Sequence, residues 1–439
     1  MKKAFIQTFG CQMNEHDSDR IKVLLKRENY EITDNMDEAK LILLNTCSVR
    51  ENPENKVYSL IGTLKSRKQT EDDLIIGVGG CVAQQEGKNI LKRNNMVDLV
   101  FGPDNIFHIG EMLAEVKAGN RVVRVAWQER KKKVQNFIPE SEIKTGKVKA
   151  GKALVSITKG CDNFCSYCIV PYTRGRLVSR DHENILEECS NLINKGAVEI
   201  TLLGQNVNSY GTEEYGFPEL LKDVADIDGL KRLRFTSPYP NDWTNELSDL
   251  LTSHPNICNQ LHLPFQAGGD NVLKAMKRDH KIKTYLEKMH YLKSINPDIA
   301  LGTDLIVGFP GETEEDFECT LDVMRQLQFK QVFAYKYSPR PGTKALSLGD
   351  TVSRQDKEKR LAKVLDLHQE IAGKLLQADV GKYVSVLIEG KDLFTDNAVK
   401  GRTEANTQIT IENCDAKSGD LIMAEVTQAR AYSLVGKAL

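Results

Sequence analysis

The 439-residue sequence lacks any long apolar run and any strong excess of charge of one sign. No stretch reaches the roughly 20 consecutive apolar residues of a membrane-spanning helix. The first residues also lack the pattern of a secretory signal peptide. We therefore expect a cytoplasmic protein without a membrane partner. The net charge of −1 provides no global electrostatic field that would indicate a nucleic-acid partner.

Internal repeats and low-complexity segments are absent as well, and the composition is that of an ordinary globular protein, with 40% hydrophobic and 28% charged residues. A length of 439 residues suggests roughly two to four domains. Ten cysteines are present. Because nothing indicates an oxidising compartment, they are interpreted as metal or redox ligands before disulfides.

Three of these cysteines, Cys161, Cys165 and Cys168, stand at C-x3-C-x2-C spacing in a loop after the apolar residues 153–157. A cubane iron-sulfur cluster needs four ligands, usually thiolates, and this loop offers three. One iron would then keep an open position, as catalytic metal sites do. Zinc accepts thiolates too, but a structural zinc site needs a fourth ligand, and no Cys or His lies just downstream. A disulfide is disfavoured, because three is an odd number.

The first 118 residues alternate between strand and helix patterns. Strands are expected at residues 4–9, 41–45, 74–78 and 97–101, and helices at residues 18–29, 54–67 and 106–116, with Ser18 as the cap of the first helix. This alternation predicts a doubly wound parallel sheet.

Cys11, Cys47 and Cys81 each follow the carboxyl end of a different expected strand. In open α/β sheets these ends share one edge, where ligands bind, so the three cysteines should converge. The alternative is three buried structural thiols, a common state of cysteine. Three such thiols would rarely all fall at the same element boundary, so the pattern favours a second cluster with three protein ligands.

Residues 119–152 are expected to be a linker. From Arg121 to Lys152 the chain carries ten Lys or Arg and three Glu, a local balance of +7. Such a run is usually a solvated connector, but beside an active site it is also a candidate for phosphate contacts.

The strand and helix alternation resumes over residues 153–378 with about six βα units, which predicts a partial TIM-type barrel with its active-site loops at the carboxyl ends of the strands. A long helix near residues 356–378 leads out of it. Residues 379–439 alternate apolar and polar positions between turns and predict a small antiparallel β-barrel. Cys189, Cys258, Cys319 and Cys414 are interpreted as structural thiols.

The cysteine loop, with Tyr167 before its last cysteine, resembles the signature of the radical S-adenosylmethionine (SAM) superfamily. With both cysteine triads in place, the whole chain resembles the radical SAM methylthiotransferases. The start Gly10-Cys11-Gln12-Met13-Asn14 is similar to the subgroup that modifies tRNA carrying N(6)-isopentenyladenosine, as are the segments at residues 168–175, 204–208 and 337–343.

This resemblance implies two [4Fe-4S] clusters, SAM, and a C-terminal RNA-binding barrel called TRAM. It implies methylthiolation at carbon 2 of N(6)-isopentenyladenosine, at position 37 of the tRNA anticodon loop. A reductive electron donor and a sulfur donor of unknown identity are implied, and a monomer is expected. The resemblance suggests contacts to SAM or substrate for these residues: Tyr167, Gly204, Gln205, Ser237, Gln266, Asp304 and Gly308.

Other functions stay open at this point. The substrate of a methylthiotransferase could instead be threonylcarbamoyladenosine tRNA or a ribosomal protein. A non-catalytic iron-sulfur carrier or RNA-binding protein belongs to a different class. The carrier would need four thiolates for each cluster, and neither triad has a fourth cysteine nearby. The C-terminal barrel itself has seven Lys or Arg against nine Asp or Glu, a poor balance for phosphate binding.

Overall fold

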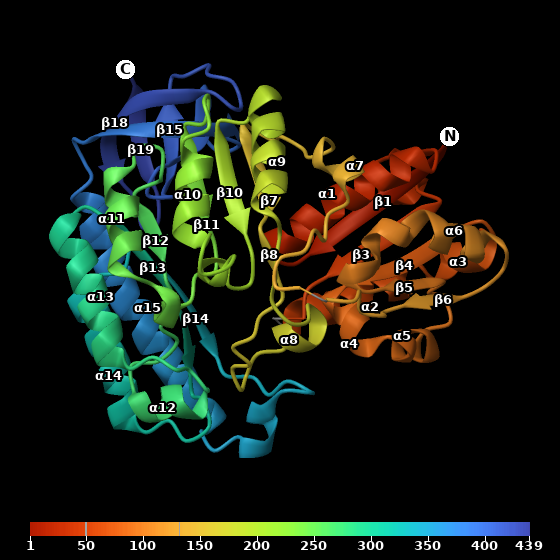
Figure 1. Cartoon of the computed structure of the whole chain (residues 1–439), viewed down its shortest axis with the longest axis horizontal. Coiled ribbons are helices and arrows are strands. Elements are labelled where there is room, and N and C mark those ends of the chain that lie inside the picture. Colours follow the sequence, from red (N-terminus) through yellow and green to blue (C-terminus); the bar gives the residue numbers. More distant parts are fainter. Residues whose placement is uncertain (49–50, 131) are drawn as a thin grey trace. The chain divides into compact units, whose positions relative to one another are not determined.

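The computed structural model describes residues 1–48, 51–130 and 132–439, with the backbone alone for residues 51–55 (Figure 1). Lys131, a member of the basic run, lies outside the described residues. The chain forms two compact units. The first unit comprises Met1–Lys147, Thr158–Asp162 and Cys168–Asp181, and the second comprises Val148–Ile157, Asn163–Tyr167 and His182–Leu439.

The first unit is built on a parallel sheet with the strand order β2-β1-β3-β4-β5-β6. The strands are β1 (Lys2–Phe9), β2 (Tyr30–Ile32), β3 (Leu41–Thr46), β4 (Ile75–Gly80), β5 (Leu99–Phe101) and β6 (Val122–Arg124). Every residue of β3 and β4 is buried. This explains their nearly continuous apolar sequences, because a central parallel strand is covered on both faces.

Helices cover both faces of this sheet. α1 (Gln12–Arg27) and α6 (Ile109–Lys117) pack on one face through Ile21, Leu25 and Met112. The helices α2 (Glu51–Thr63), α4 (Cys81–Glu86) and α5 (Lys88–Arg93) contribute to a separate core that includes Ile61 and Ile90, and α3 (Lys65–Thr70) follows α2. The doubly wound prediction is confirmed. The three-residue edge strands β2 and β6 were not expected, and β6 lies inside the segment expected to be a linker.

The prediction for the start of the first helix is wrong. α1 begins at Gln12, with Cys11 in extended conformation at its N-cap, and Ser18 is buried within the helix. The Ser18 hydroxyl lies 2.7 Å from the Thr8 hydroxyl and accepts a hydrogen bond from the Asn45 amide at 2.8 Å. Ser18 resembles a cap in the sequence, but its hydroxyl serves tertiary contacts instead.

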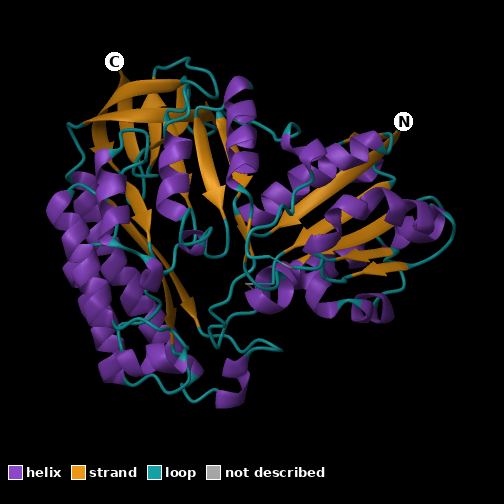
Figure 2. Ribbon diagram, in the orientation of Figure 1, coloured by secondary structure: helices purple, strands orange, loops and turns teal. Residues whose placement is uncertain are grey.

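The second unit contains the six expected parallel strands, arranged as β11-β10-β7 and β12-β13-β14. They are β7 (Lys152–Ser156), β10 (Glu199–Leu203), β11 (Arg232–Phe235), β12 (Gln260–His262), β13 (Ala300–Val307) and β14 (Gln331–Lys336). Helices follow these strands in sequence: α9 (His182–Asn194), α10 (Phe217–Ala225), α11 (Asn245–Ser253), α12 (Asp270–Ala275), α13 (Ile282–Ile295) and α14 (Glu314–Leu327). Figure 2 shows the helices in purple and the strands in orange. The partial TIM-type barrel is confirmed.

A 24-residue helix, α15 (Arg354–Gln377), leads to a closed five-stranded barrel. Its strands are β15 (Tyr383–Lys391), β16 (Ala398–Thr403), β17 (Gln408–Glu412), β18 (Leu421–Ala429) and β19 (Leu434–Ala438). The small barrel is confirmed, although β17 and β19 pair in parallel where an antiparallel arrangement was expected. Closure leaves no unpaired edge between these strands.

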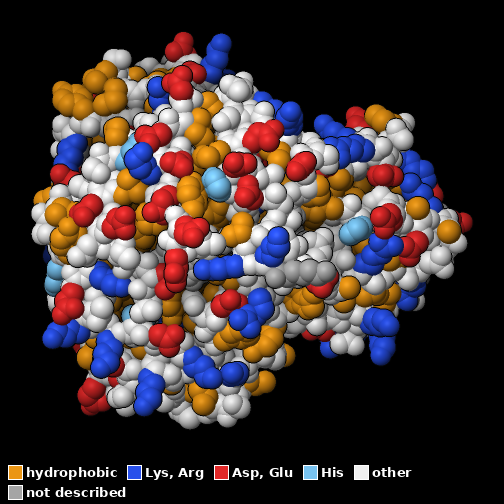
Figure 3. Space-filling view, viewed as in Figure 1, with side chains coloured by type: hydrophobic (Ala, Val, Ile, Leu, Met, Phe, Trp, Pro, Cys, Tyr) orange, Lys and Arg blue, Asp and Glu red, His pale blue; other side chains and the backbone are white. Residues whose placement is uncertain are grey.

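Two buried arginines at the start of β11 fix the small barrel to the TIM-type barrel. Arg232 donates to the carbonyl oxygens of Arg402 and Ser385 at 2.9 and 2.6 Å. Arg234 donates to those of Thr403 and Glu404 at 2.9 and 2.8 Å. The surface in Figure 3 carries Lys, Arg, Asp and Glu side chains interspersed, in keeping with the balanced net charge. No helix among the described residues is long and apolar enough to cross a membrane.

Candidate functional site

The sheet register of the first unit brings the ends of β1, β3 and β4 together. Phe9 pairs with Thr46, and Thr46 pairs with Gly80. Cys11, Cys47 and Cys81 follow these three residues directly or one position later, so all three cysteines lie at one edge of the sheet. The Cys47 amide donates to the Phe9 carbonyl oxygen at 2.8 Å, and Cys81 begins α4.

The strand ends beneath the cysteines are joined by a buried polar network. The Asn14 side-chain amide donates to the Asn45 side-chain oxygen and to the Thr46 carbonyl oxygen, both at 3.2 Å. The Asn45 amide in turn donates to the Asn14 carbonyl oxygen at 2.9 Å. The network fixes the start of α1 against β3, and thereby the position of Cys11 relative to Cys47.

The Cys11 thiol is chemically activated by its neighbours. A hydrogen bond with Cys47 lowers the pKa of Cys11 to about 6, with burial opposing the shift and the charge of Arg174 assisting it. The Cys11 sulfur also donates to the Asn14 side-chain oxygen at 3.3 Å. Because the thiolate is the form of cysteine that binds metals, this environment favours metal ligation.

The triad Cys161, Cys165 and Cys168 lies in a loop that is held by several hydrogen bonds. The Cys161 amide donates to the Gly175 carbonyl oxygen at 3.1 Å. Ser166, between Cys165 and Cys168, donates from its amide to the Met276 carbonyl oxygen and from its hydroxyl to that of Ala275, both at 2.8 Å. The three cysteines are partly exposed and form no disulfide. A partly exposed triad of thiols suits a cluster that must admit a small molecule.

Several residues predicted to contact SAM or substrate follow the carboxyl ends of the barrel strands in unusual conformations. Ser237, after β11, has φ of 58°, and Gln266, after β12, has φ of 69°. Gly308, after β13, has φ of 69°. Non-glycine residues rarely adopt this left-handed conformation, and it persists mainly where the surroundings enforce it, often at functional sites. Ser237 and Gln266 are among the non-glycine residues of the described chain that adopt it.

Hydrogen bonds connect these strand ends in pairs. The Val207 amide, in the loop after Gly204 and Gln205, donates to the Ser237 carbonyl oxygen at 3.4 Å. The Gln266 amide donates to the Asp304 carbonyl oxygen at 3.1 Å. The Asp304 carboxylate, on β13, lies 3.1 Å from His262 Nε2 on β12. The predicted residues therefore form one group on β10 and β11 and another on β12 and β13.

Arg278 joins both groups to the cysteine loop. Its guanidinium is buried, lies 4.4 Å from the centre of the Tyr239 ring, and donates to the Pro264 carbonyl oxygen at 2.7 Å. It also lies 3.9 Å from the Cys165 sulfur. Tyr239 follows β11 and Pro264 follows β12, so one buried cation contacts the two loops and the second cysteine of the triad.

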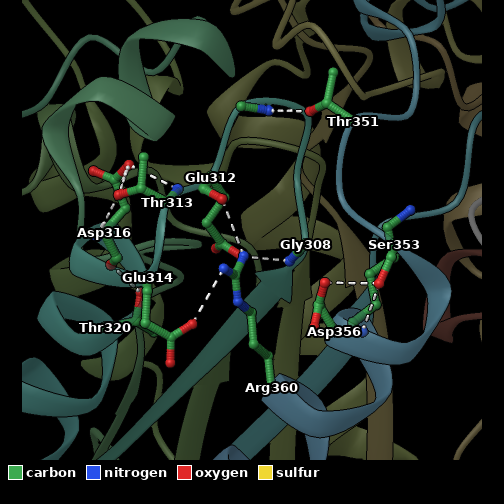
Figure 4. Close-up of polar contacts among 12 residues, drawn as sticks. Gly308, Glu312, Thr313, Glu314, Asp316, Thr320, Thr351, Ser353, Asp356 and Arg360 are labelled. Atoms are coloured by element: carbon green, nitrogen blue, oxygen red, sulfur yellow. Dashed lines mark hydrogen bonds and ion pairs between the residues drawn. The ribbon is translucent and has the colours of Figure 1, made fainter.

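Tyr167 and Gly308 belong to the same corner of the second unit. The Tyr167 ring meets the edge of the Phe309 ring at a centroid distance of 6.4 Å. The Gly308 amide donates to the Glu312 carboxylate at 2.6 Å, and Arg360 of α15 pairs with that carboxylate at 2.7 Å, as Figure 4 shows. Burial raises the pKa of Glu312, while the Gly308 amide and Arg360 oppose the shift. A side chain at Gly308 would collide with Lys357.

No group of three His, Cys, Asp or Glu side chains converges on a single metal ion within the described part of the chain. Of the remaining cysteines, Cys189 and Cys258 are buried, and burial raises the pKa of Cys258 to about 12. Cys414 is partly buried and Cys319 is exposed.

The basic segment is largely occupied by structural contacts. Arg121 donates to carbonyl oxygens at the end of α5, and Arg124 pairs with Glu111 and Glu115. The Arg130 guanidinium, which was expected to be available for phosphate, binds Asp104 and the carbonyl oxygens of Arg174 and Arg176. The exposed side chains of Lys132 and Lys133 remain candidates for phosphate contacts.

Sequence reasoning did not single out several residues that shape these sites, namely Asn45, Arg174, Arg278, Glu312 and Arg360. A usable signal existed for Asn45, a polar residue within an otherwise apolar strand. Arg174 lies within the motif that follows Cys168. Nothing in the sequence pairs Arg360 with Glu312 or Arg278 with Cys165, because these contacts join distant segments.

Comparison with known families and proteins gives matches over the whole chain. Residues 3–102 match "Uncharacterized protein family UPF0004", and residues 155–324 match the Radical SAM superfamily. The chain is 43% identical over 444 residues to the tRNA-2-methylthio-N(6)-dimethylallyladenosine synthase of Francisella tularensis subsp. holarctica (strain FTNF002-00 / FTA), covering 99% of both chains. The synthase of Francisella tularensis subsp. novicida (strain U112) gives the same identity and coverage.

Among solved structures, the radical S-adenosylmethionine methyltransferase TsrM from Kitasatospora setae matches with a TM-score of 0.57 and 14% identity. The match covers 79% of this chain and 77% of TsrM. At this identity the likeness concerns the fold alone.

Proposed function

The chain belongs to the family of the tRNA-2-methylthio-N(6)-dimethylallyladenosine synthases, and from this we propose that it methylthiolates carbon 2 of N(6)-isopentenyladenosine in the tRNA anticodon loop. Isopentenyl and dimethylallyl are two names for the same substituent. The observation that carries the proposal is the full-length match combined with two separate cysteine triads. A reductant as electron donor and a monomeric enzyme complete the proposal.

Two iron-sulfur clusters would be held by the two triads. Cys161, Cys165 and Cys168 would bind the cluster that binds SAM, and Cys11, Cys47 and Cys81 would bind an auxiliary cluster. Together with SAM, the cluster on Cys161, Cys165 and Cys168 would supply the radical chemistry needed to remove the ring hydrogen, and the auxiliary cluster would supply the sulfur for methylation. The hydrogen bond that lowers the Cys11 pKa and the anchored Ser166 loop support these ligand sets.

The remaining residues of the second unit would bind and orient. Tyr167, Gly204, Gln205, Ser237, Gln266, Asp304 and Gly308 would contact SAM or substrate. The left-handed backbone at Ser237 and Gln266, where the chain leaves β11 and β12, supports this role. The closed C-terminal barrel would hold RNA.

Nucleoside analysis of tRNA from a strain lacking the gene tests the proposal. We expect 2-methylthio-N(6)-isopentenyladenosine to disappear while N(6)-isopentenyladenosine accumulates. The intact gene should restore the product, and a gene carrying Cys11→Ala or Cys161→Ala should not. Cys258→Ala, which changes a cysteine outside both triads, is the control and should restore it. A deletion strain with unchanged 2-methylthio-N(6)-isopentenyladenosine would refute the proposal, and loss of a different methylthio product would favour the alternative substrates.

A further inference from the structure

A buried arginine contacts Cys81, one cysteine of the triad Cys11, Cys47 and Cys81. Arg174 follows the short helix α8 (Val170–Thr173), and its side chain is 3% exposed. Its Nε donates to the Cys81 sulfur at 3.3 Å. The chain segment around Arg174 is fixed, because Arg130 donates to the Arg174 carbonyl oxygen at 2.6 Å. The fixed backbone thus keeps the Arg174 guanidinium next to the Cys81 sulfur.

Asp17 of α1 compensates the charge of this arginine. The Asp17 carboxylate pairs with the Arg174 guanidinium at 2.8 Å, and both side chains are at least nine-tenths buried. Asp17 lies in α1, six residues after Cys11, which is the N-cap of this helix. The ion pair therefore adjoins Cys81 through the Nε hydrogen bond, and its carboxylate belongs to the helix that begins after Cys11.

The surroundings of the pair hold additional buried cations. Lys159 pairs with Asp104, and Arg20 donates to Thr145 at 3.0 Å. Burial lowers the pKa of His16 on α1 well below its ordinary value, and nearby cations including Arg20 and Arg174 lower it further. His16 is thus a neutral neighbour, whereas Arg174 is a cation that hydrogen-bonds to the Cys81 sulfur.

We propose that Arg174 is a positioning residue of the auxiliary cluster, which holds the Cys81 sulfur and favours the reduced, more negative form of the cluster through its buried charge. The inference rests on the proposed function, in which Cys81 is a cluster ligand. Cluster reduction potentials depend on hydrogen bonds to the sulfurs and on nearby charge, and Arg174 provides both. Asp17 moderates the charge and orients the guanidinium.

The test uses the full chain with C161A, C165A and C168A substitutions, so that a single reconstituted cluster contributes to the signal. Its midpoint potential is measured by a redox titration followed by electron paramagnetic resonance. Adding R174Q should shift the midpoint to a more negative potential, and adding D17N should shift it to a more positive one. Because R174K keeps the positive charge, its midpoint potential should lie much closer to that of the parent chain than the midpoint potential of R174Q does.

Opposite shifts separate this role from a merely structural ion pair. If Arg174 and Asp17 only stabilised the fold, both substitutions would loosen the site in the same sense and R174K would not restore the midpoint. Unchanged midpoints, or shifts of the same sign, would overturn the inference. If R174Q assembles no cluster, the sign of the D17N shift decides. A parent chain that assembles no cluster would contradict the proposed function, and this inference with it.

Discussion

The pair of Glu312 and Arg360 offers a quantitative test of how the second unit holds its Gly308 loop. Both side chains are at least nine-tenths buried. Replacing Arg360 by methionine leaves the Glu312 carboxylate with the Gly308 amide as its remaining described partner. Breaking a buried ion pair by removal of one partner costs about 3–5 kcal/mol. A loss of about 1 kcal/mol lowers the midpoint temperature of thermal unfolding by about 2–4 °C in a domain of 150–250 residues. R360M should therefore lower this midpoint temperature by on the order of 10 °C.

Replacing Glu312 should lower the free energy of unfolding by less than replacing Arg360. E312Q keeps an oxygen that can accept from Gly308, and Arg360 retains the Glu314 carboxylate at 3.3 Å. The double variant should be less destabilised than the sum of the single variants, since the buried charge left by R360M is then removed. Glu314 is largely exposed, so E314Q is a matched control with an effect below about 1 kcal/mol.

The pH dependence provides a second, independent check. Burial raises the pKa of Glu312 above its ordinary value of 4.5 in the folded chain. Such a carboxyl binds its proton more tightly when folded, so its contribution to stability is present below the unfolded pKa and is lost as pH rises through the folded pKa. R360M removes a cation that opposes this shift, and its cost should therefore grow as the pH rises above about 4.5. Thermal unfolding of the cluster-free chain across this range measures the effect. The reasoning is refuted if the double variant is destabilised by the sum of the two single variants, or if the destabilisation caused by R360M does not depend on pH.

Four further predictions follow from the sites. Reconstituted protein should hold about eight irons if both triads build cubanes, and C161A/C165A/C168A should halve this; about four irons in the intact chain would contradict two clusters. In the metal-free chain, alkylation of Cys11 should rise with pH through about 6, and C47A should move this midpoint upward because the hydrogen bond that lowers the pKa is lost. S237G should stabilise the protein by up to about 1 kcal/mol, because glycine adopts the left-handed conformation without strain, yet lower the rate of methylthiolation; an unaffected rate would remove Ser237 from the site. Finally, K132Q/K133Q, with Arg130 kept, should flatten the salt dependence of tRNA binding by about one unit of slope for each lost contact; an unaltered slope would show that neither lysine contacts phosphate.

The sequence by itself determined the architecture and the convergence of Cys11, Cys47 and Cys81 at one edge of the first sheet. Buried parallel strands favour continuous apolar residues, so β3 could be located from the apolar run at residues 41–44. The position of Cys11, Cys47 and Cys81 after successive strands follows from chain order, because parallel strands place their carboxyl ends at one edge. Short edge strands such as β2 and β6 were missed, since three residues carry too little pattern.

The tertiary structure decided which polar residues support the cysteines. Ser18 resembles a helix cap in the sequence, but its hydroxyl bonds to Thr8 and Asn45 instead. Arg130 resembles a phosphate ligand, but Asp104 and two carbonyl oxygens occupy its guanidinium. The pairing of Arg174 with Cys81 joins residues 93 positions apart. Local patterns encode backbone conformation and burial, whereas the partner of a buried charge is fixed only when distant segments pack together.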